Sequence, residues 1–78
     1  MNRVASLLRA YHAASGLSWR ALAARAGMSS TYLHDVVSGR RLASPYAARR
    51  YARALGRCEE TWLRAAVADL DERAQAQA

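Results

Sequence analysis

The apolar residues of this chain recur at the spacing of a helix. Val4, Leu8 and Tyr11 fall three or four positions apart, which predicts an amphipathic helix over residues 2–14. The same spacing predicts further helices at about residues 19–26, 30–38, 45–55 and 59–73, followed by a frayed segment at 74–78. No stretch alternates between apolar and polar residues, so the fold class is predicted to be all-α: one compact five-helix domain over residues 1–78.

Serines and glycines mark the expected helix boundaries. Ser18, Ser29 and Ser44 each stand before a helical pattern, where a hydroxyl can cap the free backbone N–H groups, and a proline follows Ser44 in the first turn. Gly27 and Gly39 follow helical patterns, where a left-handed residue ends a helix.

Two of these helices meet the requirements of a helix-turn-helix at about residues 18–38. Ala23 is the small residue needed where the helices touch, and Gly27 begins the turn four positions later. Met28, Leu33 and Val36 supply the apolar anchors of the second helix. In such a motif the second helix lies in the major groove of DNA while the first braces it across the backbone.

The outward face of the second helix carries the candidates for reading DNA bases. Hydroxyls can bond several base edges, a threonine methyl can touch thymine, and an aspartate can accept from cytosine N4. The predicted base-reading residues are Ser30, Thr31, Tyr32, His34 and Asp35. Asp35 could instead orient a neighbouring arginine, Tyr32 could lie at the edge of the core or on a phosphate, and Ser30 could contact the backbone.

The net charge of +6 is distributed unevenly. Residues 1–57 hold ten arginines and one acid, whereas residues 58–78 hold two arginines and five acids. Arginine forms bidentate contacts with phosphate, so the body of the domain is expected to attract a polyanion. Arginine without lysine is also what a GC-rich genome would produce.

Two longer stretches resemble a known family. The sequence contains GLSWRALAARAGMSSTYLHDVVSGRR and, after it, SPYAARRYARALG. The first is similar to a pattern of Leu-Ser-Gln, a Leu-Ala pair, Ala-Gly-Val-Ser, an aromatic-apolar third helix and Gly followed by basic residues, and the second to a Pro-initiated fourth helix ending in Ala-Leu-Gly. Together they resemble the XRE or Cro/repressor family of helix-turn-helix proteins over about residues 7–63, which implies a lambda-repressor-like fold and binding to double-stranded DNA.

The resemblance also implies which residues meet the DNA backbone. These are Ser18, Trp19, Arg20, Ser29, Ser38, Arg40, Arg41 and Tyr46. Trp19 stands where the family has a phosphate-binding Gln, so its indole N–H could donate to phosphate or its ring could pack over the domain. His12 and Val37 stand where the family often has an Arg–Glu pair, and we expect a repacked contact there.

The apolar stripe of the last helix is wider than one thin domain needs. A two-fold homodimer is therefore expected, since paired helix-turn-helix proteins read half-sites about 34–36 Å apart. The predicted dimer interface comprises Leu55, Trp62, Leu63, Ala66, Val67 and Leu70. The alternative is that the stripe only completes the core of a monomer.

Other classes of protein are disfavoured. Cys58 is the single cysteine, so no intramolecular disulfide or Cys-rich metal site is expected, and His12 and His34 lack further ligands at suitable spacing. His34 and Asp35 diverge by about 100° on a helix and cannot form a catalytic triad, so no enzyme is expected. No cofactor, small-molecule ligand or membrane partner is expected, and the chain is predicted to act in the cytoplasm, at the nucleoid of a bacterial or phage-infected cell.

These observations predict a transcriptional regulator that binds a palindromic operator, as a repressor of phage Cro or immunity-repressor type. A restriction-modification controller and an antitoxin are alternatives within the same class. A helical protein-interaction module, in which the basic face is incidental, is the alternative from a different class.

Overall fold

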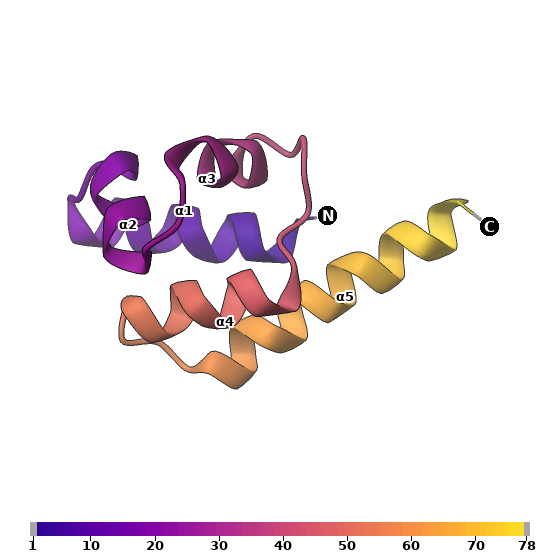
Figure 1. Ribbon diagram of the computed structural model, residues 1–78. Helices are drawn as coiled ribbons and strands as arrows, with labels where there is room; N and C mark the ends of the chain where they lie inside the picture. Colours follow the sequence, from indigo (N-terminus) through magenta and orange to yellow (C-terminus); the bar gives the residue numbers. More distant parts are fainter. Residues whose placement is uncertain (1, 78) are drawn as a thin grey trace.

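The computed structural model describes residues 2–77 as an all-α, five-helix domain (Figure 1). The helices are α1 (Arg3–Ser15), α2 (Trp19–Ala26), α3 (Ser30–Val37), α4 (Pro45–Ala54) and α5 (Glu59–Gln77). The predicted fold class is confirmed. Within these residues, no helix combines the length and hydropathy needed to cross a bilayer.

Local capping sets most of the helix boundaries. The hydroxyls of Ser18, Ser29 and Ser44 each accept the backbone N–H of the residue three positions later, at 3.0–3.1 Å. Each bond satisfies an N–H that has no partner within its own helix. The predicted helix starts are therefore confirmed, including the one where Pro45 occupies the first turn of α4.

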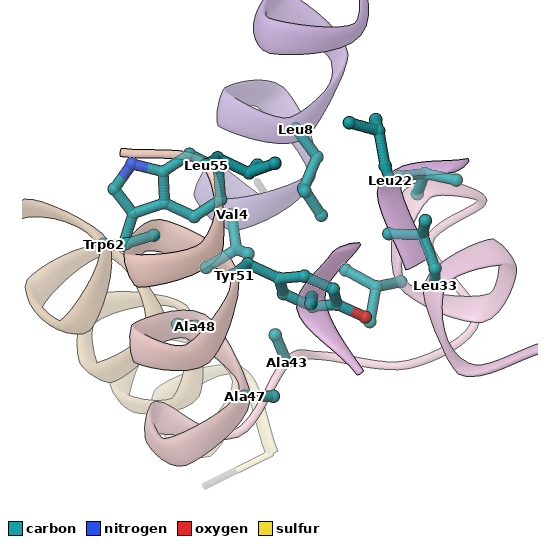
Figure 2. Packing of buried hydrophobic residues seen from close by; sticks show 14 of the residues in the cluster. Val4, Leu8, Leu22, Leu33, Ala43, Ala47, Ala48, Tyr51, Leu55 and Trp62 are labelled. Carbon is teal, nitrogen blue, oxygen red and sulfur yellow. The ribbon is translucent and has the colours of Figure 1, made fainter. Parts of the chain in front are cut away.

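The core gathers around Tyr51 of α4 (Figure 2). Its ring is fully buried, as are Leu8, Leu22 and Leu33 from the three preceding helices. Its hydroxyl has no hydrogen-bond partner among the described residues. Burial raises the pKa of this hydroxyl, and the neighbouring Tyr32 raises it further.

The last helix is longer than its sequence pattern predicted. It continues to Gln77, whereas the prediction ended it at about residue 73 and left 74–78 frayed. Alanine and glutamine are favourable helix formers, and the ion pairs of Asp69 and Glu72 with Arg3 hold the preceding turns of α5 to α1. Its C-terminal half projects beyond the other helices (Figure 1), and Ala78 lies outside the described residues.

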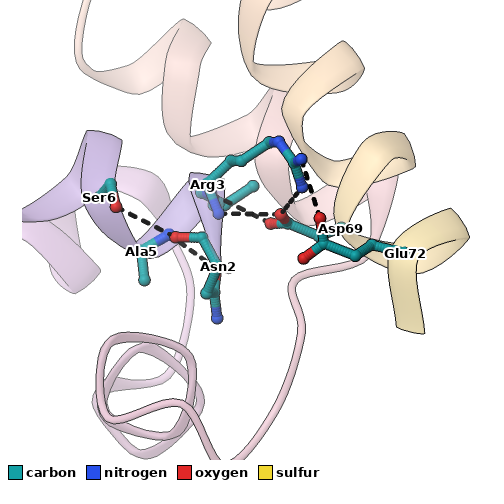
Figure 3. A network of polar contacts seen from close by, with 7 residues as sticks. Asn2, Arg3, Ala5, Ser6, Asp69 and Glu72 are labelled. Carbon is teal, nitrogen blue, oxygen red and sulfur yellow. Dashed lines mark hydrogen bonds and ion pairs between the residues drawn. The ribbon is translucent and has the colours of Figure 1, made fainter. Parts of the chain in front are cut away.

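A buried acid joins α5 to the start of α1 (Figure 3). Asp69 is 2% exposed and accepts the backbone N–H groups of Arg3 at 2.8 Å and Val4 at 3.2 Å. The Arg3 guanidinium also bonds Asp69 at 3.1 Å and Glu72 at 3.0 Å. The first turn of α1 is thus capped by a residue near the other end of the chain.

Side chains of α1 also hold the end of α3. The side-chain Oδ1 of Asn2 caps α1 by accepting the Ala5 N–H at 2.9 Å, and its Nδ2 donates to the Val36 carbonyl at 3.2 Å. The Arg9 guanidinium donates to the Val37 carbonyl. Both carbonyls lie in the last turn of α3, so these bonds fix α3 relative to α1.

Candidate nucleic-acid interface

α2 and α3 form a helix-turn-helix whose turn is closed by backbone hydrogen bonds. The Met28 N–H donates to the Ala23 carbonyl at 3.0 Å, and the Gly27 N–H donates to the Ala24 carbonyl at 3.1 Å. This paired arrangement ends a helix through a left-handed residue, and Gly27 has φ 66°. Ala23 is buried between the helices, as the sequence predicted.

An arginine from α4 lies over this turn. The Arg50 Nε donates to the Ala26 carbonyl at 2.9 Å, and a Cβ added to Gly27 would lie 2.9 Å from an Arg50 guanidinium nitrogen. The turn therefore requires glycine for its left-handed backbone, and a side chain there would also displace the end of the Arg50 side chain. Sequence reasoning missed the role of Arg50 because its partner is more than twenty positions away and no local pattern marks it.

α3 separates cleanly into a buried and an exposed face. Leu33 and Val36 are fully buried and Val37 is 8% exposed, as predicted. Ser30, Thr31, His34 and Ser38 are exposed and, at helical spacing, share one face about 100° wide. A short helix held by its apolar side thus presents donors and acceptors to the solvent.

Tyr32 lies at the border between this exposed face and the core, which is one of the alternatives expected for it from the sequence. It is half-buried, and its hydroxyl accepts the Ser44 N–H at 3.1 Å, joining α3 to the start of α4. Tyr32 lies only about 40° from Val36 around the helix, at the border of the core. The Arg41 guanidinium lies over its ring, 5.4 Å from the centroid.

Asp35 lies at the other border of the exposed face of α3, which we call the reading face. One of its carboxylate oxygens is 3.6 Å from the Arg40 guanidinium, and its side chain is 26% exposed. This contact is the one that the alternative for Asp35 requires, in which the carboxylate orients a neighbouring arginine. Its carboxylate remains partly accessible from solvent.

The Trp19 ring packs on α1, which is the alternative arrangement expected for it from the sequence. It stacks on His12 with a centroid separation of 4.0 Å and an interplanar angle of 5°. His12 and Val37 cannot form the Arg–Glu ion pair that the family often has at these positions, because Val37 is apolar and buried. Stacking and apolar packing replace an ion pair there.

The other residues predicted to contact phosphate remain at the surface. The Ser18 and Ser29 hydroxyls accept helix N–H groups and can still donate, whereas the Ser38 hydroxyl donates to the Asp35 carbonyl at 3.2 Å. Three arginines are also exposed: Arg20, Arg40 and Arg41. Tyr46 is 67% exposed, and its hydroxyl accepts a hydrogen bond from Arg50 at 2.7 Å.

The structure divides the predicted dimer interface. Leu55, Trp62 and Ala66 are at most 7% exposed because α5 packs on both α1 and α4, so these three belong to the core and their assignment to an interface is wrong. Val67 and Leu70 are exposed, at 42% and 38%, and Leu63 is half-buried. Of the residues predicted for the interface, Leu63, Val67 and Leu70 are therefore the ones accessible to another protein.

Cys58 is exposed at the start of α5. Hydrogen bonds with the side chain and backbone of Thr61 lower the pKa of its thiol. In the part of the chain that the structure describes, no group of three or more His, Cys, Asp or Glu residues could hold a metal ion.

Comparison with known families identifies one match. A family model described as a helix-turn-helix domain matches residues 3–65, which include α1 to α4 and the first part of α5. No curated protein and no solved structure gives a significant match.

Proposed function

Because the chain belongs to the helix-turn-helix domain family, we propose that it is a sequence-specific DNA-binding transcriptional regulator of the XRE or Cro/repressor type. The observation that carries the proposal is the exposed face of α3. Ser30, Thr31 and His34 are exposed there, opposite fully buried Leu33 and Val36. A helix of this kind fits the major groove of B-form DNA.

The two kinds of contact have separate roles in this proposal. Ser30, Thr31 and His34 face the base edges, where hydroxyl and imidazole groups discriminate between base pairs. Ser18, Arg20, Ser29, Ser38, Arg40, Arg41 and Tyr46 contact the phosphates on either side. Phosphate contacts set the position and orientation of the domain and supply affinity that does not depend on sequence.

Selection of bound sites from random duplexes tests the reading face. Thr31→Ala should change the preferred base at one position, because a good base contact discriminates by about 1–3 kcal/mol. Asp35→Ala should also change it, because the partly exposed carboxylate can accept from cytosine N4. Asp71→Ala, an exposed acid on α5, is the matched control and should leave the preference unchanged. Unchanged preference in both α3 variants would contradict readout by this face.

The salt dependence of binding tests the phosphate contacts. Arg40→Ala and Arg41→Ala should each weaken binding to all duplexes alike and reduce the slope of log K against log salt by about 0.9 per lost contact. Arg64→Ala removes an equally exposed arginine that is paired with Glu60 on α5, and it should not change the slope. Equal slopes in the three variants would exclude these contacts.

We further propose that the regulator binds as a two-fold homodimer through α5. Leu63, Val67, Leu70 and Ala74 recur at four- and three-residue intervals, which is the spacing of a coiled-coil seam. Such a dimer would read a palindrome with half-sites about one helical turn apart.

Sedimentation of the intact chain tests the dimer. Leu70→Glu places a charge on the exposed seam without disturbing the core, and it should give a monomer that binds a single half-site but loses the added affinity for the palindrome. A wild-type chain that stays monomeric at high concentration would contradict this part of the proposal.

Occupation of a promoter by such a dimer would make the protein a repressor acting at the nucleoid in the cytoplasm. A phage Cro or immunity repressor is the role we favour, with a restriction-modification controller or an antitoxin as the alternatives. Transcription from a promoter that carries the selected site, measured with and without the protein, distinguishes repression from activation.

A further inference from the structure

A basic concavity lies on the flank of the molecule between α2 and α4. Its volume is about 480 Å³. It is lined by Arg25, Ala26, Tyr46, Arg49, Arg50, Arg53 and Ala54. We call this site the arginine concavity. Of these residues, only Tyr46 is assigned to the DNA surface above, so the concavity is a separate feature.

Four arginines converge on this site with little compensating charge. Glu59 bonds Arg53 through both carboxylate oxygens, at 3.2 and 3.3 Å, and lies 3.5 Å from Arg49. Arg53, followed by Arg49, lowers the pKa of this carboxyl. Among residues 2–77, no carboxylate forms an ion pair with Arg25 or Arg50, so the site retains a large positive charge.

The concavity is also organised in advance of any ligand. Arg50 is fixed by its bonds to the Ala26 carbonyl at 2.9 Å and the Tyr46 hydroxyl at 2.7 Å. Glu59 holds Arg49 and Arg53 in position. Fixing a guanidinium before binding reduces the entropy lost when it meets an anion.

The lining between the charges is apolar. Ala26 is 4% exposed, Ala54 is half-buried, and Tyr46 contributes an exposed aromatic ring. α4 packs against α2 and α5 (Figure 1). A duplex seated on α3 offers phosphates and sugars but no apolar side chain to fill such a site.

We propose that the arginine concavity binds an acidic segment of a partner protein while α3 holds DNA. Carboxylates of the segment would bond Arg25 and Arg49 in the bidentate geometry that guanidinium favours. An apolar side chain between these carboxylates would cover the alanines. This binding does not depend on the proposed recognition of bases.

Fluorescence anisotropy with a labelled peptide of aspartates and glutamates around a central leucine tests the proposal. The intact chain should bind the peptide, and Arg25→Ala and Arg49→Ala should each weaken binding about fivefold or more. Arg64→Ala on α5 and Arg40→Ala beside α3 are matched controls and should leave binding unchanged. No binding to the wild-type chain, or equal weakening in all four variants, would overturn the proposal.

Competition with random-sequence duplex DNA separates the two anionic partners. The peptide should remain bound when the duplex is saturating, because Tyr46 is the one lining residue of the concavity that is also assigned to the DNA surface. Displacement by the duplex would overturn the proposal and assign these arginines to DNA. Because the peptide assay requires no DNA, failure of this inference and failure of the proposed DNA binding are measured separately.

Discussion

Replacement of Asp69 by alanine should destabilise the domain by about 2–4 kcal/mol, because it leaves two backbone N–H groups of α1 without an acceptor. The Val4 residue is fully buried, so its N–H cannot turn to water instead. The Arg3 guanidinium is 38% exposed and stays solvated, so its ion pair is left out of this magnitude. For a chain of this length the loss is a large fraction of a total stability of roughly 4–12 kcal/mol.

Urea unfolding followed by circular dichroism measures this loss. Asp71→Ala, an exposed acid on the same helix, should change the free energy of unfolding by less than about 0.5 kcal/mol. Asp69→Asn retains one acceptor oxygen and should fall between the two. The loss should persist at high salt, because buried backbone hydrogen bonds are screened far less than a surface ion pair. An Asp69→Ala variant as stable as Asp71→Ala would refute the capping role.

Three further changes probe the core, the turn and the charge network. Tyr51→Phe should leave the free energy of unfolding unchanged or raise it by up to about 1 kcal/mol, because it removes a buried hydroxyl that has no partner within residues 2–77; clear destabilisation in urea would show that the hydroxyl is satisfied. Gly27→Ala should destabilise the domain by about 1–2 kcal/mol because Gly27 has a left-handed backbone, and by a further amount because the added Cβ would displace Arg50. Gly56→Ala has nearly the same φ and open space around it, so equal losses in the two variants would argue against the Arg50 contact. Arg53 lowers the pKa of Glu59 below its ordinary value of 4.5. The charged carboxylate therefore stabilises the fold at pH values above 4.5, and this stabilisation is lost as the pH falls through the lowered pKa. Glu59→Gln should therefore flatten the fall in melting temperature on acidification, and an unchanged profile would contradict this.

The features that the sequence predicted well depend on neighbouring residues. A capping serine stands only three positions before the N–H that it accepts, so it can be recognised from the local sequence. The helix starts at Ser18, Ser29 and Ser44 were confirmed for this reason. The buried face of α3 followed from its spacing for the same reason. These signals act within one turn of helix.

The features that were missed depend on residues far apart in the chain. Asp69 lies on the same stripe as Trp62 and Ala66, where an acid interrupts the apolar pattern, and that interruption was the available signal. Periodicity also could not separate core from interface, because both are apolar. Trp62 therefore entered the predicted interface although it packs inside the domain.

The cap that Asp69 supplies has a consequence for biosynthesis. The acceptor for the first turn of α1 is translated more than sixty residues after that turn, so the nascent chain leaves the ribosome with this turn incomplete. Asp69 also lies beyond residues 3–65, the segment shared with the family. A polypeptide cut to that shared segment would keep every reading residue yet lack the acceptor that holds α1 in place beneath them.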